Sequence, residues 1–186
     1  MEVKRIMVLG SGLMGRGIAQ VAAQGGYITD MYDINADQLK AAMDVIKKNM
    51  SVAVTKGKMT EEAMEANLAR LNPTQDINLA AQAQLVIETV PEVSAIKTET
   101  YKKINEICSE DTIIASNTSA MSITELASST KRPDKFIGMH FFNPVHIMGL
   151  VEIVECQETS PEVTKVIEEV SKNMGKETVV VKDFPG

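Results

Sequence analysis

Short apolar runs alternate along this chain with longer segments in which apolar residues recur at helical spacing. The first kind predicts buried strands, and the second predicts helices that pack on a sheet. We expect strands over residues 4–9, 27–32, 85–89, 112–116, 136–140, 151–156 and 179–182. We expect helices around residues 18–22 and over residues 36–56, 60–69, 93–107, 122–128 and 161–174. This alternation favours a mainly parallel sheet with helices on both faces, the doubly wound α/β fold of the Rossmann type.

Two of the predicted helices follow one another with no strand between them. Gly57 separates the stretch 36–56 from the stretch 60–69, and turn residues of this kind interrupt helices. We therefore expect a helical hairpin inserted into the sheet after the second strand.

The turn after the first predicted strand, residues 10–15, contains three glycines at G-x-G-x-x-G spacing. Gly10 allows the tight turn, Gly12 lets a phosphate approach the backbone, and Gly15 lets the next helix pack closely on the sheet. The free N–H groups and the positive dipole end of that helix favour an anion. We expect this loop, with Leu13 and Met14, to bind the pyrophosphate of a dinucleotide.

The second predicted strand ends at Asp33, where a carboxylate would accept hydrogen bonds from the ribose hydroxyls of the adenosine half. The same carboxylate would repel the 2′-phosphate of NADP, and the following Ile34 cannot neutralise one. NAD is therefore the expected cofactor. A glycine-rich surface turn is the alternative, but strand, helix, second strand and acid all stand in the order that a nucleotide site needs.

The composition is that of an ordinary globular protein, with 44% hydrophobic and 24% charged residues. A formal net charge of −6 argues against nucleic acid as a partner, because no broad basic face is available. We see no signal peptide and no apolar run long enough to span a bilayer, and so expect a cytoplasmic protein without membrane contact. With two histidines, and two cysteines outside any ligand pattern, no metal site is expected.

Ligands of doubly wound sheets bind outside the carboxyl ends of the strands. Four loops should therefore line one edge of this sheet: residues 10–15, 90–93, 116–119 and 140–145. The third of them consists of small hydrogen-bonding residues, and the fourth begins with a histidine at a strand end.

His140 and Glu152 are candidates for a catalytic pair. Glu152 is a carboxylate in an otherwise apolar strand, so it is either solvated or buried with a partner. An enzyme that oxidises an alcohol needs a base, and histidine titrates near neutrality. From the residues alone, a structural histidine beside an exposed glutamate is an equally good interpretation. His146 competes with His140, but its position beyond a proline predicts a solvated side chain.

Three runs, residues 114–119, 131–135 and 138–144, resemble motifs of the 3-hydroxyacyl-CoA dehydrogenase family. Within that family the chain is most similar to the bacterial enzymes that act on 3-hydroxybutyryl-CoA. The resemblance extends from the glycine loop to Gly186, and it is far more specific than a dinucleotide-binding fingerprint.

The resemblance implies roles for individual residues. His140 would be the catalytic base, or the acid in the reducing direction, with Glu152 as its carboxylate partner. Ser119 would hydrogen-bond the oxygen of the substrate. Further cofactor contacts would come from Asn143 at the nicotinamide end, and from Glu92 and Lys97.

The helical hairpin corresponds to the part of the family that cradles coenzyme A. Lys56 matches a family lysine there, and Asn49 matches a small polar position. Coenzyme A is a polyanion, so an acidic protein needs local positive charge to hold it. Lys47, Lys48 and Lys58 could add to that charge, although from the residues alone a solvated helix face explains these lysines better.

The family continues for about 100 residues past the part that this chain resembles. We therefore expect residues 1–186 to form the NAD-binding domain alone, ending in a turn over residues 183–186. The helical domain that carries a further substrate-contacting asparagine and most of the dimer interface would be absent, and the full-length parent would be a homodimer. Three residues depart from the family pattern: Val93, His146 and Gly149.

These features predict an oxidoreductase that transfers a hydride between NAD and carbon 3 of a short-chain 3-hydroxyacyl-CoA. The substrate pair would be 3-hydroxybutyryl-CoA and acetoacetyl-CoA. A second interpretation is a domain that binds NAD and coenzyme A with little turnover by itself. A structural protein built on a dehydrogenase fold is a third, with little support because the candidate catalytic residues are intact.

Overall fold

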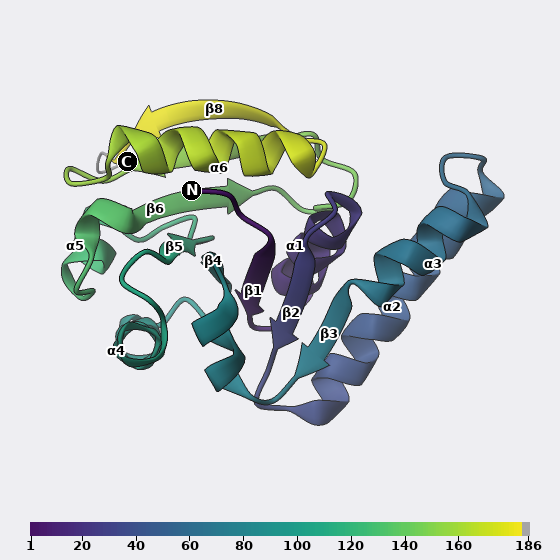
Figure 1. Cartoon of the computed structure of the whole chain (residues 1–186), viewed down its shortest axis with the longest axis horizontal. Helices are drawn as coiled ribbons and strands as arrows, with labels where there is room; N and C mark the ends of the chain where they lie inside the picture. The colour runs from purple at the N-terminus through teal and green to yellow at the C-terminus, as the bar shows by residue number, and fades with distance from the viewer. Residues whose placement is uncertain (184–186) are drawn as a thin grey trace.

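Eight strands form one sheet, in the order β3-β2-β1-β4-β5-β6-β7-β8, in the computed structural model, which describes residues 1–183 (Figure 1). Neighbouring strands run parallel, except that β6 and β7 are antiparallel. The strands are β1 (Arg5–Leu9), β2 (Ile28–Tyr32), β3 (Leu71–Thr74), β4 (Leu85–Glu88), β5 (Ile113–Ser116), β6 (Phe136–Phe141), β7 (Leu150–Glu155) and β8 (Glu177–Lys182). The predicted doubly wound, mainly parallel sheet is confirmed.

The helices form where the apolar spacing placed them. In the described residues they are α1 (Leu13–Gln24), α2 (Ala36–Thr55), α3 (Glu61–Ala69), α4 (Ser94–Ile107), α5 (Ile123–Ser128) and α6 (Pro161–Asn173), with short 3₁₀ turns η1 (Ile77–Gln82) and η2 (Pro133–Lys135). None of these helices is both long and apolar enough to cross a membrane. The turn expected over residues 183–186 lies outside the described residues except for Asp183.

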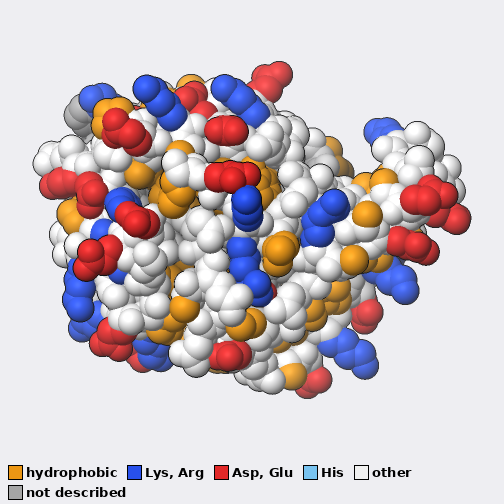
Figure 2. All heavy atoms as spheres, viewed as in Figure 1, with side chains coloured by type: hydrophobic (Ala, Val, Ile, Leu, Met, Phe, Trp, Pro, Cys, Tyr) orange, Lys and Arg blue, Asp and Glu red, His pale blue; other side chains and the backbone are white. Residues whose placement is uncertain are grey.

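The predicted helical hairpin is present as α2 and α3, which extend together from the sheet as an arm (Figure 1). Side-chain caps define where its helices start. Asn35 accepts hydrogen bonds from the first-turn amides of α2, and Thr60 accepts one from the Ala63 amide of α3 at 3.1 Å. Apolar side chains gather along this arm, while acidic and basic side chains are interspersed over the face seen in Figure 2.

The edge strand β3 was not predicted, because its sequence contains Asn72 and Pro73, which weaken any strand signal. Pairing with β2 compensates for this, and an edge position tolerates a proline. The amide of Thr29 donates to Arg70 O at 2.9 Å at the start of the pair, and that of Asp33 donates to Thr74 O at 3.2 Å at its end. Tertiary pairing therefore makes a strand of a segment that local propensity leaves as loop.

The central strands are buried on both faces of the sheet. In β1, Ile6 and Val8 point into one apolar cluster, and Met7 and Leu9 point into the other. β4 and β5 are likewise buried throughout. Continuous apolar strands of this kind need helices on both sides, which accounts for the layered arrangement in Figure 1.

The loops at the carboxyl ends of the strands meet at one edge, as predicted. The Thr89 hydroxyl, just after β4, donates to Leu9 O of β1 at 2.8 Å. The Asn117 side chain, just after β5, accepts the Phe141 amide of β6 at 3.0 Å. A fourth loop, between β6 and β7, reaches α1 through Val145, whose side chain packs against Gly17.

Replacing Ile87 by alanine tests the burial of β4 on one face of the sheet. Ile87 is 0% exposed, so Ile87→Ala leaves a cavity and should lower the free energy of unfolding by about 2–5 kcal/mol. Ile34→Ala is the matched control, because Ile34 is 81% exposed, and it should change stability by less than about 0.5 kcal/mol. Urea denaturation of both variants measures the difference, and equal effects would contradict the proposed core.

Candidate functional site

The turn between β1 and α1 has room for a ligand directly over its backbone. Gly10 has a φ of +98°, and a Cβ on Gly15 would lie 1.9 Å from Gly10 O, so both positions require glycine. A Cβ built on Gly12 would have nothing within 4 Å. Gly12 is also the N-cap of α1 and has no side chain to accept the first-turn amides. These donors, on Leu13, Met14 and the residues after them, therefore face the open side.

Asp33 turns its carboxylate toward this loop. Its Oδ2 accepts the amide of Ser11 at 2.9 Å and the Ser11 hydroxyl at 2.8 Å, while Oδ1 accepts the Asn35 amide at 3.0 Å. Since a carboxylate offers about four lone-pair positions, it retains capacity for a ligand hydroxyl. A cavity of about 660 Å³ opens beside it, and Gly12 and Ile96 of α4 are among the residues that line it. Glycine loop, acid and cavity together fit a dinucleotide.

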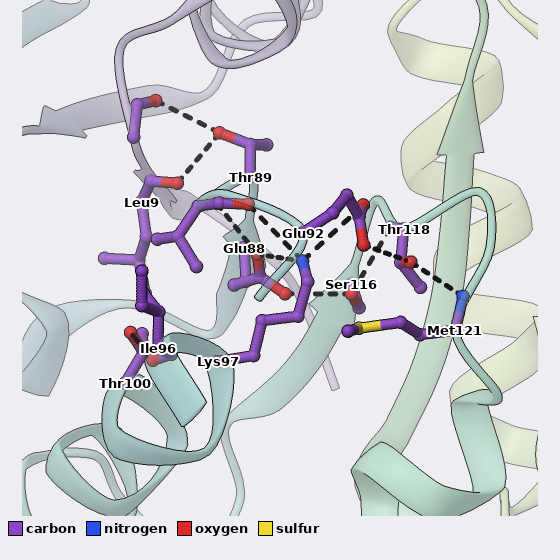
Figure 3. A network of polar contacts seen from close by, with 12 residues as sticks. Leu9, Glu88, Thr89, Glu92, Ile96, Lys97, Thr100, Ser116, Thr118 and Met121 are labelled. Atoms are coloured by element: carbon purple, nitrogen blue, oxygen red, sulfur yellow. Dashed lines mark hydrogen bonds and ion pairs between the residues drawn. The ribbon is translucent and has the colours of Figure 1, made fainter. Parts of the chain in front are cut away.

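A fully buried carboxylate, Glu88, ends β4 directly beneath this edge of the sheet. It accepts hydrogen bonds from Lys97 Nζ at 2.7 Å, the Val90 amide at 2.8 Å and Ser116 Oγ at 2.9 Å (Figure 3). The Tyr101 hydroxyl donates to it as well, at 2.5 Å. Burial, and then the charge of Glu88, raises the pKa of Tyr101, so this hydroxyl stays protonated and remains a donor. Every donor around Glu88 thus compensates for the cost of burying its charge.

Glu92 and Lys97, both expected at the cofactor, occupy different environments. The Lys97 side chain is 1% exposed and lies between Glu88 and Glu92, with 3.8 Å from its Nζ to Glu92 Oε1. The Glu92 side chain is 46% exposed and accepts the Thr118 hydroxyl at 2.8 Å (Figure 3). The loop after β4 is therefore tied to the loop that carries Ser119. Contact of Glu92 and Lys97 with a cofactor stays a prediction, and the geometry leaves Glu92 the more accessible.

His140 and Glu152 lie directly opposite each other where β6 and β7 pair. The distance from His140 Nδ1 to Glu152 Oε2 is 2.6 Å, and the side chains are 23% and 35% exposed. An ionised carboxylate only accepts hydrogen bonds, so a neutral imidazole in this position would carry its hydrogen on Nδ1 and its lone pair on Nε2. The ring of Phe142 packs against the imidazole at 4.7 Å between centroids. The register of the antiparallel pair thus sets the imidazole beside the carboxylate.

Ser119, His140 and Glu152 line a single cavity of about 810 Å³. The start of α5 and the end of β8 complete its wall, where Asp183 accepts the Ser122 hydroxyl at 2.7 Å. Ser119 follows β5, and the Asn117–Phe141 hydrogen bond joins its loop to the strand of His140. The three expected catalytic residues are therefore brought together from three different strands or loops.

The remaining predicted residues lie outside this cavity. Asn143 is exposed in the loop after β6. Asn49 of α2 donates to Gln20 of α1 at 3.1 Å, and Lys56 is exposed at the C-terminal end of α2, on the arm. Lys47, Lys48 and Lys58 are exposed too. The arm thus carries these lysines apart from the His140 cavity, and exposed acids such as Glu61 and Glu62 lie beside them.

Two of the departures from the family pattern have local consequences. Val93 is the N-cap of α4 and provides no side-chain hydrogen bond, which a polar residue could make there. His146 is exposed, as expected. Partial burial of its ring, and then the charge of Lys176, lowers the pKa of His146, so it is uncharged at neutral pH.

Sequence reasoning overlooked Glu88, Tyr101 and Thr89. Thr89 braces the glycine loop, because its hydroxyl donates to Leu9 O at 2.8 Å and reaches Gly10 O at 3.2 Å. A signal for Glu88 existed, since it is an acid in an apolar strand just as Glu152 is. Its partners were not visible, because they lie on α4 and β5, up to 28 positions away.

Comparison with known proteins finds one matching family profile, described as "3-hydroxyacyl-CoA dehydrogenase, NAD binding domain", over residues 5–184. A probable 3-hydroxybutyryl-CoA dehydrogenase of Bacillus subtilis is 44% identical over 186 residues, which are 100% of this chain and 65% of that protein. A 3-hydroxyadipyl-CoA dehydrogenase of Escherichia coli is 40% identical, over 100% of this chain and 39% of its own length.

Solved structures agree with this result. The crystal structure of (S)-3-hydroxybutyryl-CoA dehydrogenase from Ralstonia eutropha has a TM-score of 0.97 at 37% identity, covering 100% of this chain and 65% of that one. The chain thus spans less than two thirds of the length of each of these proteins.

The Glu88–Lys97 pair can be tested by a double-mutant cycle. Glu88→Gln leaves the Lys97 ammonium buried without its counter-charge and should cost about 3–5 kcal/mol of unfolding free energy. Lys97→Met should cost a similar amount, whereas the double variant should recover much of the loss because no buried charge remains. Urea denaturation of the wild type and the three variants gives the coupling. Simple additivity of the two losses would show that the pair does not act as a unit.

Proposed function

The chain belongs to the family of 3-hydroxyacyl-CoA dehydrogenase NAD-binding domains, and on this premise we propose that the protein transfers a hydride between NAD and carbon 3 of a 3-hydroxyacyl-CoA. The observation that carries the proposal is the His140–Glu152 pair, 2.6 Å apart in the wall of the cavity that Ser119 also lines. The proposed substrates are short, 3-hydroxybutyryl-CoA and acetoacetyl-CoA, in keeping with the name of the Bacillus subtilis relative.

NAD supplies the hydride acceptor at its nicotinamide ring, and the residues around the β1–α1 turn fit its adenosine half. The first-turn amides of α1 would hold the pyrophosphate over Gly12. Asp33 would accept the ribose hydroxyls and repel a 2′-phosphate. Asn143 and Glu92 would hold the nicotinamide end, with Lys97 supporting Glu92 from below.

His140 would handle the proton of the reaction. As the hydride leaves carbon 3, the hydroxyl proton passes to Nε2 and the C–O bond becomes a carbonyl. Glu152 would stabilise the resulting imidazolium through the hydrogen bond that it already accepts from Nδ1. Ser119 would donate a hydrogen bond to the same substrate oxygen. In the reducing direction each transfer runs backwards.

The arm formed by α2 and α3 would bind the coenzyme A part of the substrate. Exposed lysines at its end, Lys56 among them, provide the charge that phosphates require, and Asn49 would add a polar contact. We further propose that the protein works in the cytoplasm, without nucleic-acid or membrane partners, and that the full-length parent is a homodimer.

A domain that binds NAD and coenzyme A with little turnover is the second candidate. It is favoured by one observation, namely that the chain spans 65% of its Bacillus subtilis relative. Residues supplied by the rest of such a protein could be needed to close the cavity around the substrate.

A single-turnover assay of this chain separates the two candidates. With enzyme in excess over NADH and acetoacetyl-CoA in excess over both, even slow hydride transfer appears as a loss of NADH absorbance. We expect a measurable rate, because the proton-transfer pair and the glycine loop are formed in this chain. Tight NADH binding by titration calorimetry without any loss of absorbance would instead support the binding domain.

The assignment of His140 is tested in the same assay. His140→Ala removes the proton donor and should slow hydride transfer by about 100-fold or more, with NADH affinity within about twofold of the wild type. Glu152→Gln keeps the shape of the side chain but removes the charge that would stabilise the imidazolium, and should therefore also slow hydride transfer strongly. His146→Ala is the matched control and should leave the rate unchanged, since His146 is exposed and outside the cavity. Equal rates for His140→Ala and His146→Ala would refute the assignment.

A further inference from the structure

Lys176 lies in the turn between α6 and β8, where its side chain is folded into the protein. Gly175, with a φ of +73°, ends α6 and reverses the chain, and the Lys176 amide returns to Ser171 O at 3.0 Å. The residue is 7% exposed, which is rare for a lysine. Its burial lowers the pKa of the ammonium, the expected result of desolvation.

The ammonium of Lys176 is bound by backbone carbonyls of a single loop. Its Nζ donates to Val145 O at 2.5 Å and to Met148 O at 2.7 Å. No carboxylate oxygen of the described residues lies within 4.0 Å of it. The next residue, Glu177, adds a backbone bond to Gly149 O at 2.7 Å. The turn after α6 therefore clamps the loop between β6 and β7 at its middle and at its end.

The clamped loop joins the two halves of the site. It begins just after His140, carries Asn143, and leads into the strand of Glu152. Its Val145 side chain is 2% exposed and packs against α1 at Gly17. A Cβ on Gly17 would lie 2.8 Å from Val145 Cβ, so the loop touches the backbone of the nucleotide-binding helix. A shift of Val145 would therefore move Asn143 relative to α1.

We propose that Lys176 is a positioning residue that holds the Asn143–Val145 segment in place against α1. By doing so it shapes the subsite for the nicotinamide end of the cofactor. This inference rests on the proposed function, in which Asn143 contacts that end. A methionine would fill the same space without the cost of burying a charge. What the ammonium adds is two directed hydrogen bonds to loop carbonyls, which apolar packing cannot supply.

Two ligands separate positioning from general stability. NADH occupies both halves of the cofactor site, whereas ADP-ribose has the adenosine and pyrophosphate but no nicotinamide. Measured by titration calorimetry, Lys176→Met should weaken the binding of NADH by about tenfold and that of ADP-ribose by less than about twofold. Lys176→Arg keeps donors for both carbonyls and should restore NADH affinity to within about threefold of the wild type. Lys172→Met makes the same chemical change on the exposed end of α6 and should alter neither affinity.

Unchanged NADH affinity in Lys176→Met would overturn the proposal, and so would an equal loss of both ligands by a folded variant. If Lys176→Met does not fold, Val145→Ala loosens the same loop without touching a charge. It should again weaken the binding of NADH more than that of ADP-ribose. Equal losses of affinity for the two ligands would count against the proposal. A wild-type chain that binds NADH but transfers no hydride contradicts the proposed function instead, and leaves this comparison of ligands valid.

Discussion

The buried carboxylate of Glu88 is the interaction on which the arrangement of the site depends. It ends β4, the strand at the centre of the sheet, and takes donors from α4, from β5 and from its own loop. A buried charge must be satisfied from every side, so the carboxylate admits only one relative placement of these elements. Through Lys97 and Glu92 the same constraint reaches Thr118, next to Ser119. The need to satisfy a buried carboxylate thus helps to place the loops at the exposed edge of the sheet.

A reversal of strand direction supplies the other half of the site. Parallel neighbours need a long crossover connection, whereas antiparallel strands can follow one another directly along the chain. Here the antiparallel pair of β6 and β7 sets His140 opposite Glu152. The loop between these two strands leaves the sheet and returns. It is held by the hydrogen bond from Lys176 to Val145 O and by the packing of Val145 against Gly17. The candidate site therefore combines a hydrogen-bonded cluster around Glu88 with a loop that Lys176 holds by hydrogen bonds.

Much of the fold follows from local sequence signals. Apolar spacing and capping signals predicted the five helical segments after β2 to within one residue at each end, and the glycine loop with Asp33 predicted the turn between β1 and α1. Such signals work because each depends on residues that are close in the sequence. A helix depends on the spacing of its apolar residues, and a glycine turn depends on the φ angle that the glycine itself can adopt. β3 shows the limit, since Asn72 and Pro73 form a strand only because β2 offers them a ladder.

The sequence by itself determined the order of elements, the dinucleotide loop and the types of residue available for chemistry. The residues alone left His140 balanced between a catalytic and a structural histidine, and only the family resemblance favoured the catalytic role. Only the tertiary structure placed Nδ1 of His140 at 2.6 Å from Glu152. The register of an antiparallel pair depends on both strands and on the loop between them, so neither strand alone predicts it. The contacts of Glu88 and Lys176 were likewise decided by folding. A buried charge is defined by partners distant in the chain, and those partners exist only once the sheet has formed.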